Sequence, residues 1–159
     1  MRGWQAQRDL LAPVNVGNMH WCLVCVDFDR KTIQYYDSMN DGGLEYLRAM
    51  RRYLGDHHRA TYDGAPLDSD AWTLVPTTPT TPQQSNGYDC GVFATFCAHY
   101  LAYGISPDLP SFSQDDVRHL RRRMMIDILN KRLVSESGWR SSSGTPLERG
   151  HHLPRRPAQ

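Results

Sequence analysis

Residues 20–37 read HWCLVCVDFDRKTIQYYD. Residues 21–28 are almost continuously apolar, and residues 32–37 are rich in β-branched and aromatic side chains, both typical of β-strands. Residues 29–31 between them form a polar turn. The stretch therefore predicts a β-hairpin whose first strand is buried on both faces.

One helix and one short strand are predicted after this hairpin. Apolar side chains recur at helical spacing over residues 44–54, which predicts an amphipathic helix after the Asp-Gly-Gly break at residues 41–43. Residues 55–70 are polar and predict a loop, and residues 71–75 predict a short third strand.

The second half of the chain predicts two more helices. Residues 76–89 are rich in proline and threonine and predict an extended lead-in. The apolar run that starts at residue 90 predicts a helix buried in the core and ended by Gly104. A Ser-x-x-Asp pattern at residues 113–116 predicts a last helix that runs to about residue 133. The arginines at 121–123 predict a solvated helix face, with a patch for an acidic partner as the alternative.

Length and composition limit the class of protein. The chain has 159 residues, about one domain; we expect residues 1–133 to form it and residues 134–159 to be a disordered tail. A net charge of +1 argues against nucleic acid binding by charge. No apolar run approaches the roughly 20 residues that span a bilayer, and the N-terminus lacks the apolar region of a secretory signal. We therefore expect neither a membrane protein nor a secreted one.

The four cysteines are Cys22, Cys25, Cys90 and Cys97. Because no secretory signal is present, we expect a reducing compartment and free thiols. Cys22 and Cys25 have the spacing of a zinc or redox C-x-x-C motif, but positions i and i+3 of a strand point to opposite faces. We therefore interpret both as buried small hydrophobic residues.

Cys90 is the residue with the strongest indication of chemistry. It stands where the loop meets the buried helix, directly before Gly91. The positive end of the helix dipole favours a thiolate there, and the glycines at 87 and 91 allow a substrate backbone to approach closely. A core cysteine at a helix start is the alternative interpretation.

A thiol nucleophile needs a base, and the base needs an orienting group. In the predicted hairpin, position 20 faces positions 38–40, so Asp37 lies within two or three residues of the register opposite His20. We expect the Asp37 carboxylate to accept a hydrogen bond from Nδ1 of His20 and to leave Nε2 free to take the thiol proton. The other candidate bases are weaker: the histidine pair at 57–58 lies in a charged loop, and those at 99 and 119 lie on helices with no acid at hairpin distance.

Gln84 lies six residues before Cys90, on the loop that enters the buried helix. Its side-chain amide and the backbone N–H of Cys90 are placed to donate hydrogen bonds to a developing oxyanion.

Two stretches of the chain resemble one protein family. Residues 13–39, PVNVGNMHWCLVCVDFDRKTIQYYDSM, and residues 82–93, PQQSNGYDCGVF, look like the sentrin/SUMO-specific cysteine proteases, ubiquitin-like-protein proteases related to the adenoviral protease. The His-Trp pair, the Tyr-Tyr-Asp-Ser strand end and the Gln-x-x-x-x-Asp-Cys-Gly pattern carry the resemblance. It extends over about residues 9–133.

The resemblance implies an α+β fold of the papain-like or adenain-like type, with a small central sheet and a buried helix that carries the nucleophile. It implies His20 as base and Asp37 as its orienting group. Cys90 is then the nucleophile and Gln84 the oxyanion-hole donor, with no metal or other cofactor. The resemblance also implies that Trp21 clamps the narrow Gly-Gly tail of the substrate, whereas the residues alone favour core packing for this side chain.

The chain departs from the family's pattern at its N-terminal side. The family's catalytic domain normally begins with several helices before the position of Trp4, and this sequence lacks them. The segment between Trp4 and Asp9 is also shorter. We therefore expect an N-terminally incomplete domain with an exposed apolar side.

The activity implied by the resemblance is cleavage after the C-terminal diglycine of SUMO, which deconjugates SUMO from target lysines or matures its precursor. The implied partners are SUMO or a related ubiquitin-like protein and its conjugates, bound by a monomer with a nuclear or cytoplasmic location. Two alternatives stay open: a protease for another ubiquitin-like protein such as NEDD8, and a catalytically impaired binder of ubiquitin-like proteins.

Overall fold

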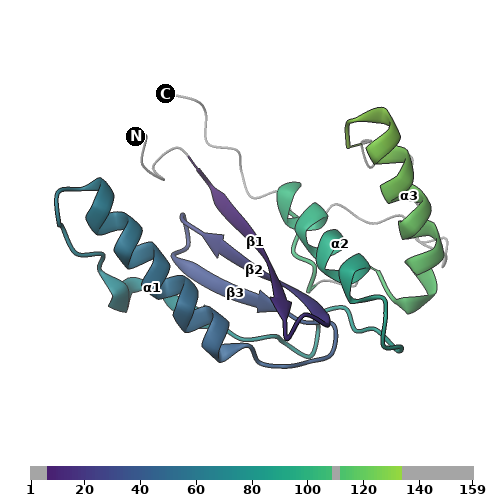
Figure 1. The fold of residues 1–159 in the computed structure, drawn as a ribbon, viewed down its shortest axis with the longest axis horizontal. Helices are drawn as coiled ribbons and strands as arrows, with labels where there is room; N and C mark the ends of the chain where they lie inside the picture. Colours follow the sequence, from purple (N-terminus) through teal and green to yellow (C-terminus); the bar gives the residue numbers. More distant parts are fainter. Residues whose placement is uncertain (1–6, 109–111, 134–159) are drawn as a thin grey trace.

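A four-stranded sheet with helices on both faces forms the fold (Figure 1). The computed structural model describes residues 7–108 and 112–133. The strands are β1 (Asp9–Val16), β2 (His20–Asp27), β3 (Thr32–Tyr36) and β4 (Thr73–Val75), and they lie in that order. β1, β2 and β3 are antiparallel neighbours, and β4 runs parallel to β3. The α+β class and the predicted β2–β3 hairpin are confirmed.

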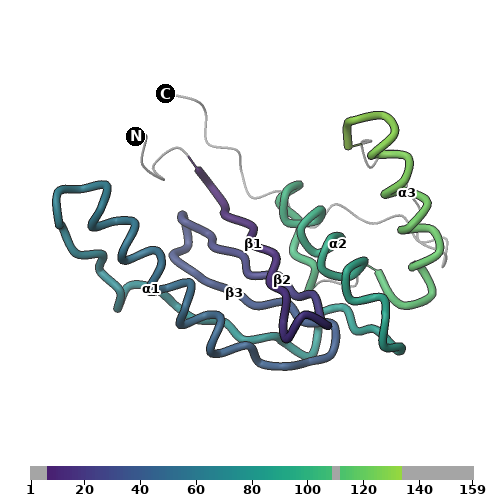
Figure 2. Tube along the Cα trace, in the orientation of Figure 1, coloured from purple at the N-terminus to yellow at the C-terminus, as the bar shows by residue number. Residues whose placement is uncertain are grey.

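The helices lie on opposite sides of the sheet, as the trace in Figure 2 also shows. Helix α1 (Leu44–Thr61) packs on one face, and helix α2 (Cys90–Ala102) packs on the other. Helix α3 (Val117–Asn130) covers α2 from the side away from the sheet. The core therefore has two parts, one on each side of β2 and β3.

Strand β2 contributes to both parts, because successive side chains of a strand point to opposite faces. Leu23 and Cys25 pack with α2, whereas Cys22 and Val24 pack on the α1 side. Cys22 and Cys25 thus face opposite sides, as predicted, and all four cysteines are free thiols.

Strand β1 is not among the elements that the sequence predicts, because Pro13 and Gly17 interrupt its apolar run. It pairs with β2 over its whole length, from Asp9 opposite Asp27 to Val16 opposite His20. It is an edge strand of the sheet. An edge strand tolerates Pro13 because the missing N–H can face away from the neighbouring strand.

Helix α1 is longer than the sequence predicts. It starts after Gly43, whose left-handed φ of 60° and close approach to the Tyr35 ring leave no room for a side chain. It runs to Thr61, so residues 55–61, which the sequence predicts as part of a loop, are helical. Histidines 57 and 58 therefore lie on α1. No residue from 55 to 61 is fully buried, so these turns need no apolar stripe. Arg59 there pairs with Asp56 at 2.7 Å.

The end of the described chain follows the prediction closely. The Ser113 and Asp116 capping box is present, and a short 3-10 turn, η3 (Gln114–Asp116), leads into α3. Another such turn, η2 (Ser69–Ala71), precedes β4. The predicted disordered tail, residues 134–159, lies outside the described residues.

The described residues carry several exposed apolar side chains on α3, at Met125, Ile126, Ile128 and Leu129. None of the helices that the structure describes is both long and apolar enough to cross a bilayer.

Candidate active site

Three element ends bring the predicted catalytic residues to one region of the molecule. His20 is the first residue of β2, Asp37 directly follows β3, and Cys90 is the first residue of α2. Because β2 pairs with β3 and packs on α2, these ends converge. Cys90 shares a surface groove with Met19 and Trp21, the residues on either side of His20.

The predicted contact between His20 and Asp37 is present. Nε2 of His20 lies 2.6 Å from Oδ1 of Asp37. The hairpin register explains the contact: Leu23 pairs with Tyr36, so the same register places position 20 opposite position 39, two residues beyond Asp37. The His20 side chain is only 16% exposed, so the pair is shielded from most of the solvent.

The ring nitrogen in this contact differs from the prediction. We expected Nδ1 to face the carboxylate, but Nε2 does so, and Nδ1 is buried with no hydrogen-bond partner among the described residues. Rotation of the ring about its bond to Cβ decides which nitrogen meets Asp37, and neither strand register nor residue type fixes that rotation. Nδ1 is thus the nitrogen left for a thiol proton.

Asp37 is held in place by its own turn. It is 2% exposed, and its carboxylate accepts hydrogen bonds from the backbone N–H groups of Met39 at 2.7 Å and Asp41 at 3.3 Å. The backbone carbonyl of Asp37 accepts from Nε2 of Gln83 at 3.1 Å. An acid fixed in this way can orient the His20 ring and stabilise it when it is protonated.

Gln84 lies on the loop that enters α2 and contacts the chain just after β3. Its backbone N–H donates to the carbonyl of Ser38 at 2.9 Å, and its Oε1 accepts from the Ser38 hydroxyl at 2.6 Å. Its Nε2 donates to the carbonyl of Asn86. An amide nitrogen carries two hydrogens, so one donor remains, and the oxyanion role of Gln84 stays a prediction.

Trp21 lies at the surface and not in the core. Its side chain is 43% exposed, whereas Leu23, two residues along the strand, is buried. A Cβ atom on Gly91 would lie 3.8 Å from Cδ1 of Trp21, which places the indole against the start of α2. The core-packing interpretation is therefore wrong for Trp21, and its role as a clamp stays a prediction.

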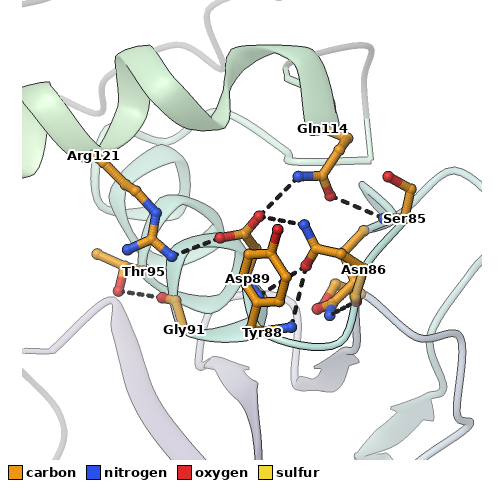
Figure 3. A network of polar contacts seen from close by, with 10 residues as sticks. Ser85, Asn86, Tyr88, Asp89, Gly91, Thr95, Gln114 and Arg121 are labelled. Carbon is orange, nitrogen blue, oxygen red and sulfur yellow. Dashed lines mark hydrogen bonds and ion pairs between the residues drawn. The ribbon is translucent and has the colours of Figure 1, made fainter.

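A network of polar contacts surrounds Asp89, the residue before Cys90 (Figure 3). The buried carboxylate accepts hydrogen bonds from Asn86 at 2.7 Å, from Gln114 at 2.8 Å and from Arg121 at 2.6 Å. Oε1 of Gln114 in turn accepts from the backbone N–H of Ser85 at 2.9 Å. The loop that carries Gln84 and Cys90 is thereby tied to η3 and α3.

The charge of Asp89 follows from these contacts. Burial acts to raise the pKa of Asp89, but the hydrogen bonds from Asn86, Arg121 and Gln114 outweigh it and hold this pKa below its ordinary value. The predicted solvated face of α3 is confirmed for Arg121 and Arg122, which are exposed, although Arg121 also pairs with Asp89. It is wrong for Arg123, whose side chain is largely buried and whose Nε lies 3.0 Å from Asp127. The partner of Arg121 could not be read from sequence spacing, since 32 positions separate it from Asp89.

Cys22 lies beside the His20–Asp37 pair and has no role in the predicted chemistry. Burial raises the pKa of the Cys22 thiol to about 12, and the nearby Asp37 carboxylate adds to the shift. A ring nitrogen of His20, Sγ of Cys22 and a carboxylate oxygen of Asp37 lie within 4.8 Å of one another. These three residues are the group of potential metal ligands in the described part of the chain.

Comparison with protein families gives a match over most of the chain. Residues 7–133 match the Ulp1 protease family, C-terminal catalytic domain. A sentrin-specific protease of Caenorhabditis elegans is 33% identical over 126 residues, which cover 79% of this chain and 17% of that protein. Human sentrin-specific protease 2 is 34% identical over 130 residues, 80% of this chain and 21% of that protein. The chain thus spans about a fifth of the length of these relatives.

A solved structure gives the same match in three dimensions. The C-terminal Ulp1 protease domain, determined in complex with Smt3, the yeast ortholog of SUMO, has a TM-score of 0.61 and is 27% identical. The match covers 77% of this chain and 52% of that one.

Proposed function

The chain belongs to the Ulp1 protease family, and from this membership we propose that it is a cysteine protease that cleaves after the C-terminal diglycine of SUMO. It would deconjugate SUMO from target lysines, mature the SUMO precursor, or both. It acts as a monomer without metal or cofactor and works in the nucleus or the cytoplasm.

The observation that carries the proposal is the pair of His20 and Asp37 beside the groove that holds Cys90. A thiol, an imidazole and a buried carboxylate in this order are the parts of a thiol hydrolase. The sentrin-specific names of the relatives and the Smt3 complex of the solved structure support SUMO as the substrate.

Catalysis starts with the thiol of Cys90. Nδ1 of His20 takes the thiol proton, because Asp37 occupies Nε2. Sγ of Cys90 then attacks the carbonyl carbon of the terminal glycine. The protonated ring returns this proton to the leaving amine, so the C–N bond breaks and a thioester remains on Cys90.

The thioester is resolved by water. His20 takes a proton from the attacking water, and hydroxide adds to the thioester carbonyl. The C–S bond then breaks, and the proton returns to the sulfur of Cys90. In both steps the backbone N–H of Cys90 and the free N–H of Gln84 stabilise the negative charge on the carbonyl oxygen.

Substrate selection follows from the absence of a side chain in glycine. The exposed indole of Trp21 lies against Gly91 at the groove that holds Cys90. We propose that this flat ring covers the diglycine tail of the substrate and excludes residues that carry a Cβ atom.

Three fusion substrates test the proposal: SUMO, NEDD8 and ubiquitin, each extended past its diglycine by a short peptide. We expect cleavage of the SUMO fusion after the diglycine, and no cleavage by Cys90→Ser. Preferential cleavage of the NEDD8 fusion would show that NEDD8, and not SUMO, is the substrate. Binding of SUMO without cleavage would make it a non-catalytic binder.

A further inference from the structure

Cys22 extends the pair of His20 and Asp37 to a group of three potential metal ligands. His20 and Cys22 are two residues apart on β2, so their side chains lie on the same face of the sheet. Asp37 follows the neighbouring strand, and one ligand atom from each of the three lies within 4.8 Å of the other two.

We propose that His20, Cys22 and Asp37 form a binding site for Zn²⁺ or a similar divalent transition metal ion, and that the bound ion inhibits the enzyme. Imidazole nitrogen, thiolate sulfur and carboxylate oxygen are the three ligand types that zinc uses in proteins. A thiolate disfavours Mg²⁺ and Ca²⁺, which take oxygen ligands. Three protein ligands leave a fourth position of a tetrahedral ion for water.

The burial of Cys22 and Asp37 indicates a preformed metal site and not a chance approach of mobile side chains. Cys22 is 0% exposed and Asp37 is 2% exposed, so both are fixed by the surrounding core. A ligand set that is already assembled loses little conformational entropy when an ion binds.

A bound ion works against catalysis at this site, because a cation on Nε2 of His20 disfavours the protonated ring that forms when Nδ1 takes the thiol proton. Nε2 of His20 and Oδ1 of Asp37 are 2.6 Å apart, the distance of a hydrogen bond. Two ligands of a tetrahedral zinc ion lie roughly 3.4 Å apart, given metal–ligand bonds of about 2.1 Å. The ion therefore takes the place of the shared proton and opens the pair by less than about 1 Å. Cys22 releases its thiol proton to solvent when its sulfur binds.

The inhibition rests on the proposed protease function, whereas metal binding does not. A metal that bound Cys90 and His20 would also inhibit, but it would not need Cys22. Variants of individual cysteines therefore separate the two modes. Cys97 provides a matched control, because it is equally buried but packs among the α2-side residues.

Cobalt absorption tests binding without any protease assay. Co²⁺ added to the purified chain gives a thiolate-to-cobalt charge-transfer band when a cysteine binds the ion. We expect the band in the unmodified chain, in Cys90→Ser and in Cys97→Ser, and its loss in Cys22→Ser. A band that persists in Cys22→Ser or disappears in Cys90→Ser would overturn the proposal, as would no band in any chain.

A second variant covers the case in which Cys22→Ser does not fold. In the Cys90→Ser chain, the additional change His20→Ala removes a ligand at a strand end. We expect it to weaken Co²⁺ binding by about tenfold or more. Unchanged Co²⁺ affinity would overturn the assignment.

Zinc inhibition then links the site to activity. SUMO-fusion cleavage is measured over a Zn²⁺ series, with each variant normalised to its own metal-free rate. We expect Cys22→Ser to need about tenfold more Zn²⁺ for half-inhibition than the unmodified chain or Cys97→Ser. Equal sensitivity of all three would contradict inhibition through Cys22. If no chain cleaves SUMO, the protease proposal fails while the cobalt result still decides the metal site.

Discussion

Gln83 and Gln84 are neighbours in the chain but have different partners. Nε2 of Gln83 donates to the carbonyls of Asp37 and Thr81, so both of its amide hydrogens are used within the scaffold. Nε2 of Gln84 donates to the single carbonyl of Asn86 and keeps one hydrogen for a substrate. Gln84 is therefore the glutamine suited to an oxyanion.

This difference predicts separate effects of two alanine variants. Gln84→Ala should lower kcat about 10²- to 10³-fold, because one oxyanion donor is lost, while Cys90 stays reactive with iodoacetamide. Gln83→Ala, the matched control, should mainly lower the melting temperature. Steady-state kinetics and thermal melting of both variants check this, and a larger fall of kcat in Gln83→Ala would reverse the assignment.

Trp21 gives a second prediction at the residue scale. Because its side chain is 43% exposed, Trp21→Ala should leave the melting temperature nearly unchanged while SUMO cleavage collapses. A buried tryptophan would instead cost about 3 to 5 kcal/mol of stability on truncation to alanine. Trp72, which is 8% exposed, provides that comparison. Strong destabilisation of Trp21→Ala with normal activity per folded molecule would remove Trp21 from the site.

At the scale of elements, the Asp89 network connects the nucleophile loop to η3 and α3 (Figure 3). Since folding lowers the pKa of Asp89, the unfolded chain takes up a proton at this group first as the pH falls. The stabilisation from Asp89 is thus complete above the ordinary aspartate pKa of about 3.9 and is lost as the pH falls through the lower, folded value.

Acid unfolding of a charge-neutral variant tests this contribution. Asp89→Asn should be less stable than the unmodified chain at neutral pH, and the difference should shrink as the pH falls below about 4. Melting temperatures of both chains across the acid range measure it. Asp115→Asn, outside the network, is the control, and a difference that grows toward acid pH would contradict the assigned contacts.

The elements that the sequence predicts are those whose pattern is local. The hairpin and α2 follow from residue type and periodicity alone, and the His20–Asp37 contact follows from the hairpin register. Strand β1 could not be predicted in this way, because its pairing with β2 compensates for an interruption at Pro13. The same holds for the end of α1 and for the partner of Arg121, which depend on contacts between distant residues.

At the scale of the whole molecule, α3 presents apolar side chains to solvent. Ile128 and Leu129 are 72% and 74% exposed, and exposed apolar side chains promote association between copies. The double change Ile128→Lys and Leu129→Lys should therefore reduce the self-association of the monomer at high concentration without lowering activity. Light scattering over a concentration series checks it. Leu120→Lys, at a buried position of the same helix, should unfold the chain. Unaltered scattering by the double variant would contradict a contribution of this surface.

The proposed protease function depends on Cys90 as the nucleophile that attacks SUMO. The most direct measurement is peptide mapping by mass spectrometry after incubation of the chain with SUMO that carries a C-terminal vinyl sulfone. We expect one covalent SUMO adduct, attached to Cys90, and its loss in Cys90→Ser. We expect slow formation in His20→Ala, because the base is missing. An adduct on Cys22, Cys25 or Cys97, or no adduct on a folded chain, would contradict this role of Cys90.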